Sequence, residues 1–419
     1  MRILKLTSAT LTIAGLLSSC SDSALPASVG ETTATSTTTV RSDDGELLIG
    51  AIVPRNGAAA ELGSSISDAL ALAVGEINTA GGVGGMPVRV IEREEGDNEA
   101  TASLAVLELI ELGVDAIIGP TSSTNTLATL GTAVDAGVLT CSPTASALAL
   151  DSFPDNGLFI RTIASDSLQA EALASLVESS GTSSAVIVYV DDNYGRPFAQ
   201  QARLAVLAEG ASVTAMVGFT ANENSVAAAV TAVVAAQTEV VVVIADGTTG
   251  PEIIAAIDDA SSLSPTFVVN DAIRRPATSA RPFGPGLITR IEGVSPLAFP
   301  TSESFMDALR NINAAATGLF AQNGYDCLNA IALAALSAGS DQPSAIARQI
   351  PIVTDQGTPC NNFATCAESL AAGRQIDYSG PGRDLTIGPD GEVLTAFFER
   401  FTFDADGRDI TSGLVTVGN

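Results

Sequence analysis

The residues best suited to chemistry lie where an apolar run opens onto a polar loop. Residues 114–126 read VDAIIGPTSSTNT, in which Gly-Pro is followed by four consecutive hydroxyl side chains and an asparagine. In open parallel sheets, ligands bind at the carboxyl ends of strands, near helix N-termini. The same hydroxyls could instead cap the helix that follows. From this stretch alone, a ligand-binding loop and a set of helix caps both stay open.

The residue types exclude several other kinds of chemistry. The chain has 419 residues, 19 basic against 47 acidic, with a formal net charge of −28 and no histidine. Nucleic acids and anionic membranes need clustered Lys and Arg, so neither is an expected partner. Histidine triads and histidine metal ligands are excluded, and Lys5 is the only lysine. We therefore expect no enzymatic activity, no metal and no cofactor.

The first residues are typical of a secretory signal. Basic residues precede an apolar run, Leu11 to Leu17, that is too short to span a bilayer. The LSSC sequence ending at Cys20 is similar to the bacterial lipobox, in which the cysteine is lipidated after cleavage. We predict a signal peptide at 1–19 and a lipidated Cys20 that opens a Ser/Thr-rich tether at 20–46. An ordinary signal with a chance cysteine is the alternative.

This N-terminus places the rest of the chain outside the cytoplasm. The expected location is the periplasm or the cell surface, with the membrane contacted through the lipid anchor only. Four cysteines remain beyond Cys20, an even number in an oxidising compartment. Cys360 and Cys366 are predicted to form a small disulfide loop. For Cys141 and Cys327, a second disulfide and two buried free thiols both stay open.

From residue 47 onward, short β-branched runs alternate with Ala/Leu-rich segments of helical periodicity. Residues 47–54 predict a strand and 62–80 a helix that ends in Gly-Gly. The same alternation of strand-like and helix-like segments occurs again from residue 184 onward, with a nearly continuous apolar strand at 239–247. Strands that are apolar on both faces indicate parallel sheets covered by helices on both sides. The predicted fold class is α/β, with two doubly wound parallel-sheet lobes.

Six segments, in the right order, resemble one family. The helix end EINTAGGVGGMP is similar to the motif E-I-N-x-x-G-G-[VI]-x-G-x-P, with Gly84 at the variable position after the valine. The others are IIGPTSS, CSPTASALAL, FIRTIASDSLQAEALA, DDNYGRPFAQ and GYDCLNAIALAAL. Over residues 47–410, the chain resembles the type I periplasmic binding proteins of branched-chain amino-acid ABC transporters.

The resemblance implies two lobes joined by a three-strand hinge that closes on a ligand. The first lobe would comprise 47–163 and 296–378, and the second 164–295 and 379–419. The implied partners are a small-molecule ligand, expected to be an amino acid, branched-chain or other, and the permease and ATPase of an ABC importer. The chain is expected to act as a monomer.

The resemblance also implies a set of ligand-binding residues in the first lobe. Ser123 would hold the ligand carboxylate, since a hydroxyl and N–H groups at a helix start suit an anion. The Thr144 carbonyl would accept from the ligand ammonium, and the Ser146 hydroxyl would bridge both charged groups. Ala145 and residues 54–63 would shape the side-chain pocket. For Ser123 and Ser146, helix capping is the alternative.

The second lobe would contribute two further groups. Tyr194 would reach in from its Y-G turn, or simply pack that turn. Asp271 would pair with the ligand ammonium where the family usually has glutamate, or else cap a helix or pair with Arg274. Glu61 would disfavour an apolar ligand if it pointed inward, and would otherwise be a solvated loop carboxylate.

Three functions are compatible with these residues to different degrees. The leading one is an extracytoplasmic solute receptor that feeds an ABC importer. A receptor of the same fold could instead signal to a partner, and some members bind amides, urea or aromatic acids, which would leave Asp271 with another role. An extracellular enzyme is disfavoured by the lack of histidine and of lysine beyond Lys5.

Overall fold

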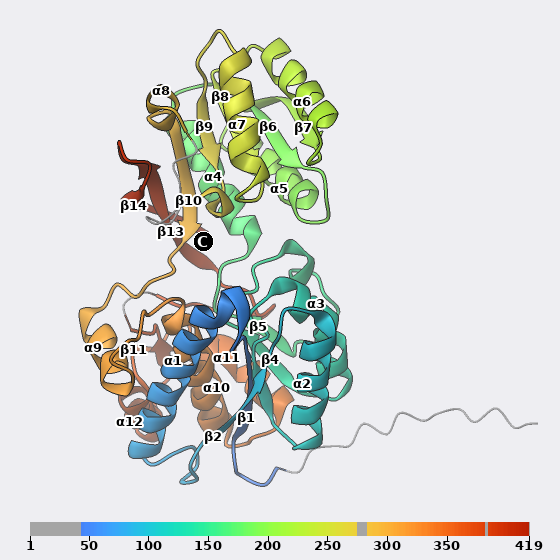
Figure 1. Cartoon of the computed structure of the whole chain (residues 1–419). Coiled ribbons are helices and arrows are strands. Elements are labelled where there is room, and N and C mark those ends of the chain that lie inside the picture. The colour runs from blue at the N-terminus through green and yellow to red at the C-terminus, as the bar shows by residue number, and fades with distance from the viewer. Residues whose placement is uncertain (1–42, 275–282, 382–383, 419) are drawn as a thin grey trace, which may run out of the picture. The chain divides into compact units, whose positions relative to one another are not determined.

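The computed structural model of the protein describes residues 43–274, 283–381 and 384–418 (Figure 1). The predicted signal peptide, the lipidation site at Cys20 and most of the tether lie outside these residues. Within the described ranges, no helix is both long enough and apolar enough to cross a membrane.

The first series of strands builds a five-stranded sheet. Its strand order is β2-β1-β3-β4-β5, and each neighbouring pair is parallel. The strands are β1 (Leu48–Val53), β2 (Arg89–Glu94), β3 (Ala116–Ile118), β4 (Leu139–Ser142) and β5 (Phe159–Arg161). Because parallel neighbours need a crossover connection, this order requires the strand–helix alternation that the sequence predicts.

Helices cover both faces of this sheet. In β1, Ile49 and Ala51 pack in a core with α1 and α10, whereas Ile52 packs on the opposite face with α2. A strand that is apolar on both faces is therefore buried on both faces, as in a doubly wound fold. The helices around this sheet are α1 (Ala60–Thr79), α2 (Glu99–Glu111), α3 (Ser123–Asp135), α9 (Glu303–Ile312), α10 (Ala321–Ala338), α11 (Pro343–Val353) and α12 (Phe363–Ala371).

The second series builds a seven-stranded sheet of order β14-β13-β10-β9-β8-β6-β7. Its strands are β6 (Ser184–Val190), β7 (Ser212–Phe219), β8 (Val240–Ile244), β9 (Thr266–Val269), β10 (Ile291–Pro296), β13 (Thr395–Phe403) and β14 (Asp409–Gly418). In β8, Val242 packs towards α4 and α5, and Val243 packs towards α7. The covering helices are α4 (Asp166–Ser179), α5 (Gly195–Ala208), α6 (Glu223–Ala235), α7 (Thr249–Ala260) and α8 (Pro285–Ile288).

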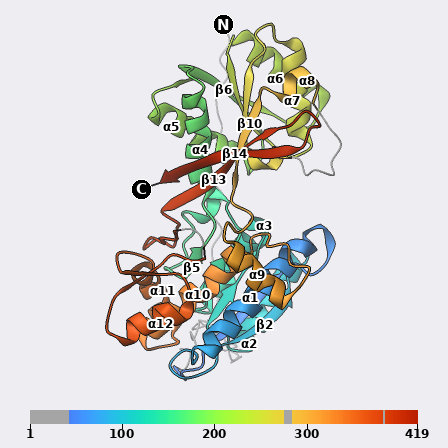
Figure 2. The same cartoon turned by 90° about the vertical axis from the view of Figure 1, so that its left-hand side faces the viewer.

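The predicted α/β class with two sheets is confirmed, but the second sheet is not wholly parallel. β13 runs antiparallel to β10, and β14 antiparallel to β13. Figure 2 shows the hairpin beside β10. A tight turn joins the two strands, in which the Gly407 N–H donates to the Asp404 carbonyl at 3.0 Å. A short turn of this kind joins antiparallel neighbours without a crossover helix, so the alternation ends here.

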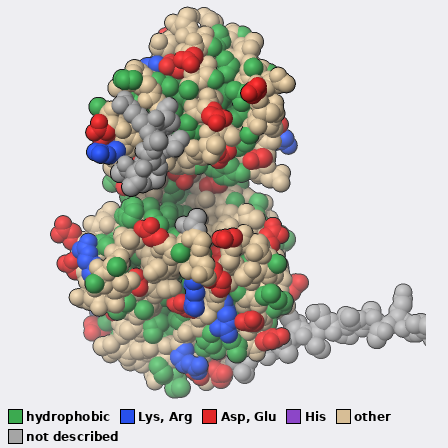
Figure 3. Space-filling model, in the orientation of Figure 1, with side chains coloured by type: hydrophobic (Ala, Val, Ile, Leu, Met, Phe, Trp, Pro, Cys, Tyr) green, Lys and Arg blue, Asp and Glu red, His purple; other side chains and the backbone are tan. Residues whose placement is uncertain are grey.

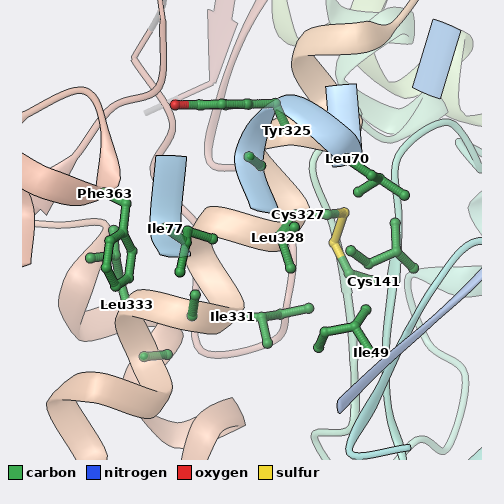
Figure 4. Close-up of a cluster of buried hydrophobic side chains, with 14 of the residues drawn as sticks. Ile49, Leu70, Ile77, Cys141, Tyr325, Cys327, Leu328, Ile331, Leu333 and Phe363 are labelled. Carbon is green, nitrogen blue, oxygen red and sulfur yellow. A yellow bond between two sulfur atoms is a disulfide. The ribbon is translucent and has the colours of Figure 1, made fainter. Parts of the chain in front are cut away.

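The four described cysteines form two disulfides. Cys360 and Cys366 are paired, beside the small parallel sheet of β11 (Thr358–Cys360) and β12 (Ile376–Tyr378). Cys141 and Cys327 are also paired, which answers the question that the sequence left open. This second disulfide joins β4 to α10 inside the first core (Figure 4).

The chain passes three times between the elements of the first sheet and those of the second. The first passage leads from β5 to α4, the second from β10 to α9, and the third from β12 to β13. β5 and the start of α4 therefore lie where the two halves meet. The candidate site is found at this junction.

Candidate functional site

The polar loop before α3 binds a carboxylate of the chain itself. Glu95, directly after β2, is 1% exposed. It accepts hydrogen bonds from the Thr121 N–H at 2.8 Å, the Thr121 hydroxyl at 2.6 Å and the Ser122 N–H at 2.9 Å. Asn125 donates a fourth at 3.0 Å. Charge-assisted bonds to N–H groups at a helix start stabilise a buried carboxylate, so this loop is partly occupied before any ligand binds.

Ser123 is free of the capping role, which Ser122 performs. The Ser122 hydroxyl is the side-chain N-cap of α3. Ser123 is the first residue of the helix, and its hydroxyl accepts from the Ala147 N–H at 3.3 Å. It thereby joins the start of α3 to the loop that follows β4, where the other predicted first-lobe residues lie.

The loop after β4 holds its backbone in place through hydrogen bonds to neighbouring elements. The Thr144 hydroxyl donates to the Thr121 carbonyl at 2.8 Å. Ala145 is fully buried, and its N–H donates to the Ser142 hydroxyl at 3.1 Å. The Ser146 carbonyl accepts from the Asp166 N–H at 2.9 Å. The loop is therefore tied to the start of α3 and to the start of α4.

Two carboxyl groups, those of Asp166 and Asp271, lie close together near the start of α4. Asp166 is the first residue of α4 and is 4% exposed. Asp271 follows β9, and its Oδ1 accepts from Gln169 Nε2 at 2.8 Å. Burial and the nearby charge of Asp271 raise the pKa of Asp166 to about 7, although a hydrogen bond from Ser146 opposes the shift. Burial also raises the pKa of Asp271, and the bond from Gln169 opposes it.

Arg274, the alternative partner predicted for Asp271, forms its ion pairs with other acids. The guanidinium of Arg274 forms ion pairs with Glu399 on β13 and Asp409 on β14. The Asp271 carboxylate is instead held by Gln169 from α4. Two neighbouring acids with raised pKa values disfavour each other's ionisation, and a cation placed between them would relieve this cost. Such a pair suits a bound ammonium group.

Tyr194 lies immediately before α5, and its backbone is set by an aspartate. Asp192 Oδ1 accepts from the N–H groups of Tyr194 at 2.9 Å and Gly195 at 2.7 Å. The Tyr194 hydroxyl accepts from Asn270 Nδ2 at 3.1 Å, and its ring packs edge-on against Phe198. Tyr194 as a whole is 38% exposed, but desolvation of its hydroxyl end and the charges of Asp271 and Asp166 raise its pKa above the usual value. Tyr194 and the two acids therefore share one neighbourhood.

A cavity of about 660 Å³ brings several of these groups together. Its volume lies within the range typical of small-molecule sites. One wall comes from α3 and the loop after β4, and the other from the starts of α4 and α5. The lining residues are Ser123, Thr124, Leu127, Ala147, Leu148, Ala149, Asp166, Asp192, Asn193, Tyr194, Arg196 and Pro197.

The cavity contains some of the predicted residues and adds others. Ser123 and Tyr194 line it, and Asp271 lies close to Asp166 and Tyr194 at one side. Ala145 is fully buried, and the lining contains neither Ala145 nor its neighbours Thr144 and Ser146. Glu61 is exposed on the first turn of α1 and is not a lining residue either.

Sequence reasoning missed Asp166 and Glu95. Asp166 stands in the FIRTIASDSLQ segment, where an acid in the first turn is expected from the helix dipole alone. Glu95 stands among other acids in EREEGD. Burial alone distinguishes Glu95 from its neighbours, whereas Asp166 also belongs to one of the six segments that resemble the family. Figure 3 shows acidic side chains spread widely over the molecular face, so acidity itself carries no signal here.

Comparisons with known proteins agree with this architecture. The sequence matches the periplasmic binding protein family over residues 46–393. A leucine-, isoleucine-, valine-, threonine- and alanine-binding protein of Pseudomonas aeruginosa is 24% identical over 321 residues, which cover 74% of this chain and 83% of the relative.

Solved structures share the fold at low sequence identity. An ABC transporter substrate-binding protein from Desulfitobacterium hafniense, in complex with Leu, is 18% identical with a TM-score of 0.66, covering 87% of this chain and 99% of that one. A solute-binding protein of R. palustris in complex with benzoate is 16% identical with a TM-score of 0.61, covering 90% and 98%. The family match spans most of the sequence, and the chain therefore belongs to the periplasmic binding protein family, with the fold of its type I members.

Proposed function

We propose that this protein is the extracytoplasmic solute-binding receptor of an ABC importer and that it binds an amino acid without turnover. The observation that carries the proposal is the pair of acids, Asp166 and Asp271, at the edge of a cavity whose other wall carries Ser123. The acids suit an ammonium group. The Ser123 hydroxyl and the start of α3 suit a carboxylate. The α-amino acid is the ligand class that carries both groups.

The remaining cavity wall indicates the kind of side chain. Leu127, Leu148 and Ala149 present apolar surface to the cavity. Arg196, the basic residue of the lining, is already paired with Asp191 at 2.6 Å. We therefore favour an aliphatic side chain over an acidic one. The P. aeruginosa relative, named for five amino acids of small or aliphatic side chain, supports this choice.

A thermal-shift screen of the purified protein tests the proposal. The ligands are the proteinogenic amino acids, simple amides, urea and benzoate. Stabilisation grows with ligand concentration and reaches about 2.7 kcal/mol at 100 times Kd. Stabilisation by aliphatic amino acids is expected. A response to benzoate or amides alone would keep the receptor role and remove the ammonium site.

The same proposal includes the cellular location of the protein, its oligomeric state and the closure of its two lobes. We propose lipidation at Cys20, a monomer, and closure of the lobes at 47–163 with 296–378 and 164–295 with 379–419. The lipobox-like sequence supports the first point. The variant Cys20→Ala should move the protein from the membrane fraction to the soluble fraction of the host cell, and unchanged membrane retention would contradict the anchor.

A further inference from the structure

The side chain of Arg161, the last residue of β5, is completely buried. A buried cation is costly unless charged or polar groups surround it. Two carboxylates do so: Arg161 forms an ion pair with Asp151, and its Nε donates to Glu392 Oε2 at 2.6 Å. These partners come from different parts of the chain, because Asp151 follows the cavity loop and Glu392 precedes β13.

The same guanidinium holds the cavity loop directly. Arg161 Nη1 donates to the carbonyls of Ala145 at 3.2 Å and Ala147 at 3.3 Å. These two residues flank Ser146. Ala147 lines the cavity, and the Ser146 carbonyl receives the N–H of Asp166. The planar fork of arginine can satisfy two carbonyls and two carboxylates together, which a lysine ammonium cannot do with the same geometry.

Asp151 extends this arrangement to the start of α4. Its two carboxylate oxygens each lie 2.9 Å from the Ser165 hydroxyl, which donates to them. The Ser165 hydroxyl also accepts from the Ser167 N–H at 3.0 Å and is the N-cap of α4. Asp166 is the next residue. Arg161 is thus linked to Asp166 through the Asp151 carboxylate and the Ser165 N-cap.

Glu392 links Arg161 to the third passage of the chain, which leads from β12 to β13. Next to it, the backbone N–H of Arg161 donates to the Gly391 carbonyl at 3.1 Å. Gly391 has φ +81, and a Cβ there would lie 2.1 Å from the Phe159 carbonyl oxygen. A glycine is therefore required for this close approach. The segment then continues into β13 of the second sheet.

We propose that Arg161 is a positioning residue of the ligand site. Its guanidinium fixes residues 145–147 and the start of α4, and Glu392 couples that geometry to the passage that enters β13. The arrangement of the loop is a property of the unliganded chain, whereas the effect on affinity rests on the function proposed above. The two parts therefore need separate measurements.

Hydrogen exchange in the full-length protein tests the first part. Arg161→Lys keeps the positive charge and loses the fork, so amide exchange in residues 145–147 and at Asp166 should rise by about fivefold or more. Glu392→Gln, which keeps the side-chain shape, is the second variant if the lysine protein does not fold. It is measured at pH 8, because burial raises the pKa of Glu392 to about 7. Arg290→Lys is the matched control, since this half-buried arginine pairs with Asp258 and donates to the Pro265 carbonyl at 2.7 Å, and none of these residues lines the cavity.

Calorimetry with L-leucine as the probe tests the second part. Arg161→Lys should raise Kd by about tenfold or more, while Arg290→Lys leaves it within about twofold. If the wild-type protein does not bind leucine, the proposed ligand class fails, and hydrogen exchange alone decides on Arg161. Unchanged loop exchange, a loosened loop with unchanged Kd, or equal effects in the control would each overturn the proposal.

Discussion

The backbone N–H of Thr121 and its hydroxyl both donate to Oε2 of Glu95, at 2.8 and 2.6 Å. The loop that looks like an anion site in the sequence therefore already contains an anion. Ser123 and Thr124, further along the chain, line the cavity. This arrangement separates a structural carboxylate from the place where a ligand carboxylate would bind.

Glu95→Ala should lower the free energy of unfolding by about 2–4 kcal/mol, because it leaves buried donors without an acceptor. Urea denaturation measures the change. Glu99→Ala is the matched control, since Glu99 is exposed in the first turn of α2. Equal stabilities of the two variants would show that the Glu95 carboxylate contributes nothing beyond a surface charge.

Asp271→Asn and Asp166→Asn should each weaken binding of an α-amino acid by about tenfold to a hundredfold, because a buried ammonium loses a charged partner. Calorimetry with the amino acid found in the screen measures this. Asp192→Asn is the control, since Asp192 lines the cavity but its carboxylate is engaged by backbone N–H groups. A ligand bound equally well by all three variants would remove the acids from the site.

The pH dependence follows from the raised pKa of Asp166, about 7 in the fold against 3.8 for the free group. Between these values the unfolded chain binds fewer protons than the fold, so the stability of the unliganded protein falls as pH rises from about 4 to 7. Binding of an ammonium favours the ionised acid. Affinity should therefore rise with pH up to about 7, by about tenfold per unit at most, and then level off.

Titration calorimetry in buffers of different ionisation enthalpy measures this and counts the protons released on binding. Asp166→Asn should flatten the profile between pH 5 and 8, leaving the smaller contribution of Asp271. A wild-type affinity that is constant over this range would contradict the role of Asp166.

Tyr194→Phe should weaken ligand binding by about fivefold, because it removes a polar group from the cavity wall that is worth about 1 kcal/mol to a bound ligand. The loss of the bond from Asn270 should lower the free energy of unfolding by about 1 kcal/mol, while the edge-on contact with Phe198 stays. Tyr189→Phe on β6, outside the cavity lining, serves as the control. A large loss of stability with unchanged affinity would assign Tyr194 to packing of its turn.

The two disulfides should differ in their contribution to stability. Cys141–Cys327 closes a separation of 186 residues and Cys360–Cys366 one of 6. In the loop-entropy account these correspond to about 5 and about 2 kcal/mol. The double variant Cys141→Ala/Cys327→Ala should therefore unfold at lower denaturant than Cys360→Ala/Cys366→Ala. The reverse order would show that local packing, not loop closure, dominates.

The elements were largely predictable because each is encoded locally. The β1 prediction of 47–54 and the observed Leu48–Val53 differ only at the ends. The hairpin of β13 and β14 was not predicted, although alternate burial along β13 reflects a period of two. Its antiparallel pairing depends on β10, which lies far away in the sequence.

The site was predictable only in part, for a related reason. Tyr194 lines the cavity and Asp271 lies near Tyr194, and the roles of both residues towards a ligand stay predictions. The role of Arg161 depends on Glu392, which is 231 residues away. No local pattern distinguishes a buried, multiply paired arginine from a solvated one, so a single sequence does not reveal it.

The order of β10 and β13 in the sequence affects how the second sheet is completed during synthesis. β10 gains its outer neighbour only when β13 has been synthesised, so this edge of the sheet stays open until then. A product truncated before Thr395 would expose the edge of β10 and lack Phe398 and Phe401, both core residues. An open edge of this kind invites pairing with other chains. Products that end before Thr395 should therefore be recovered as aggregates or be degraded.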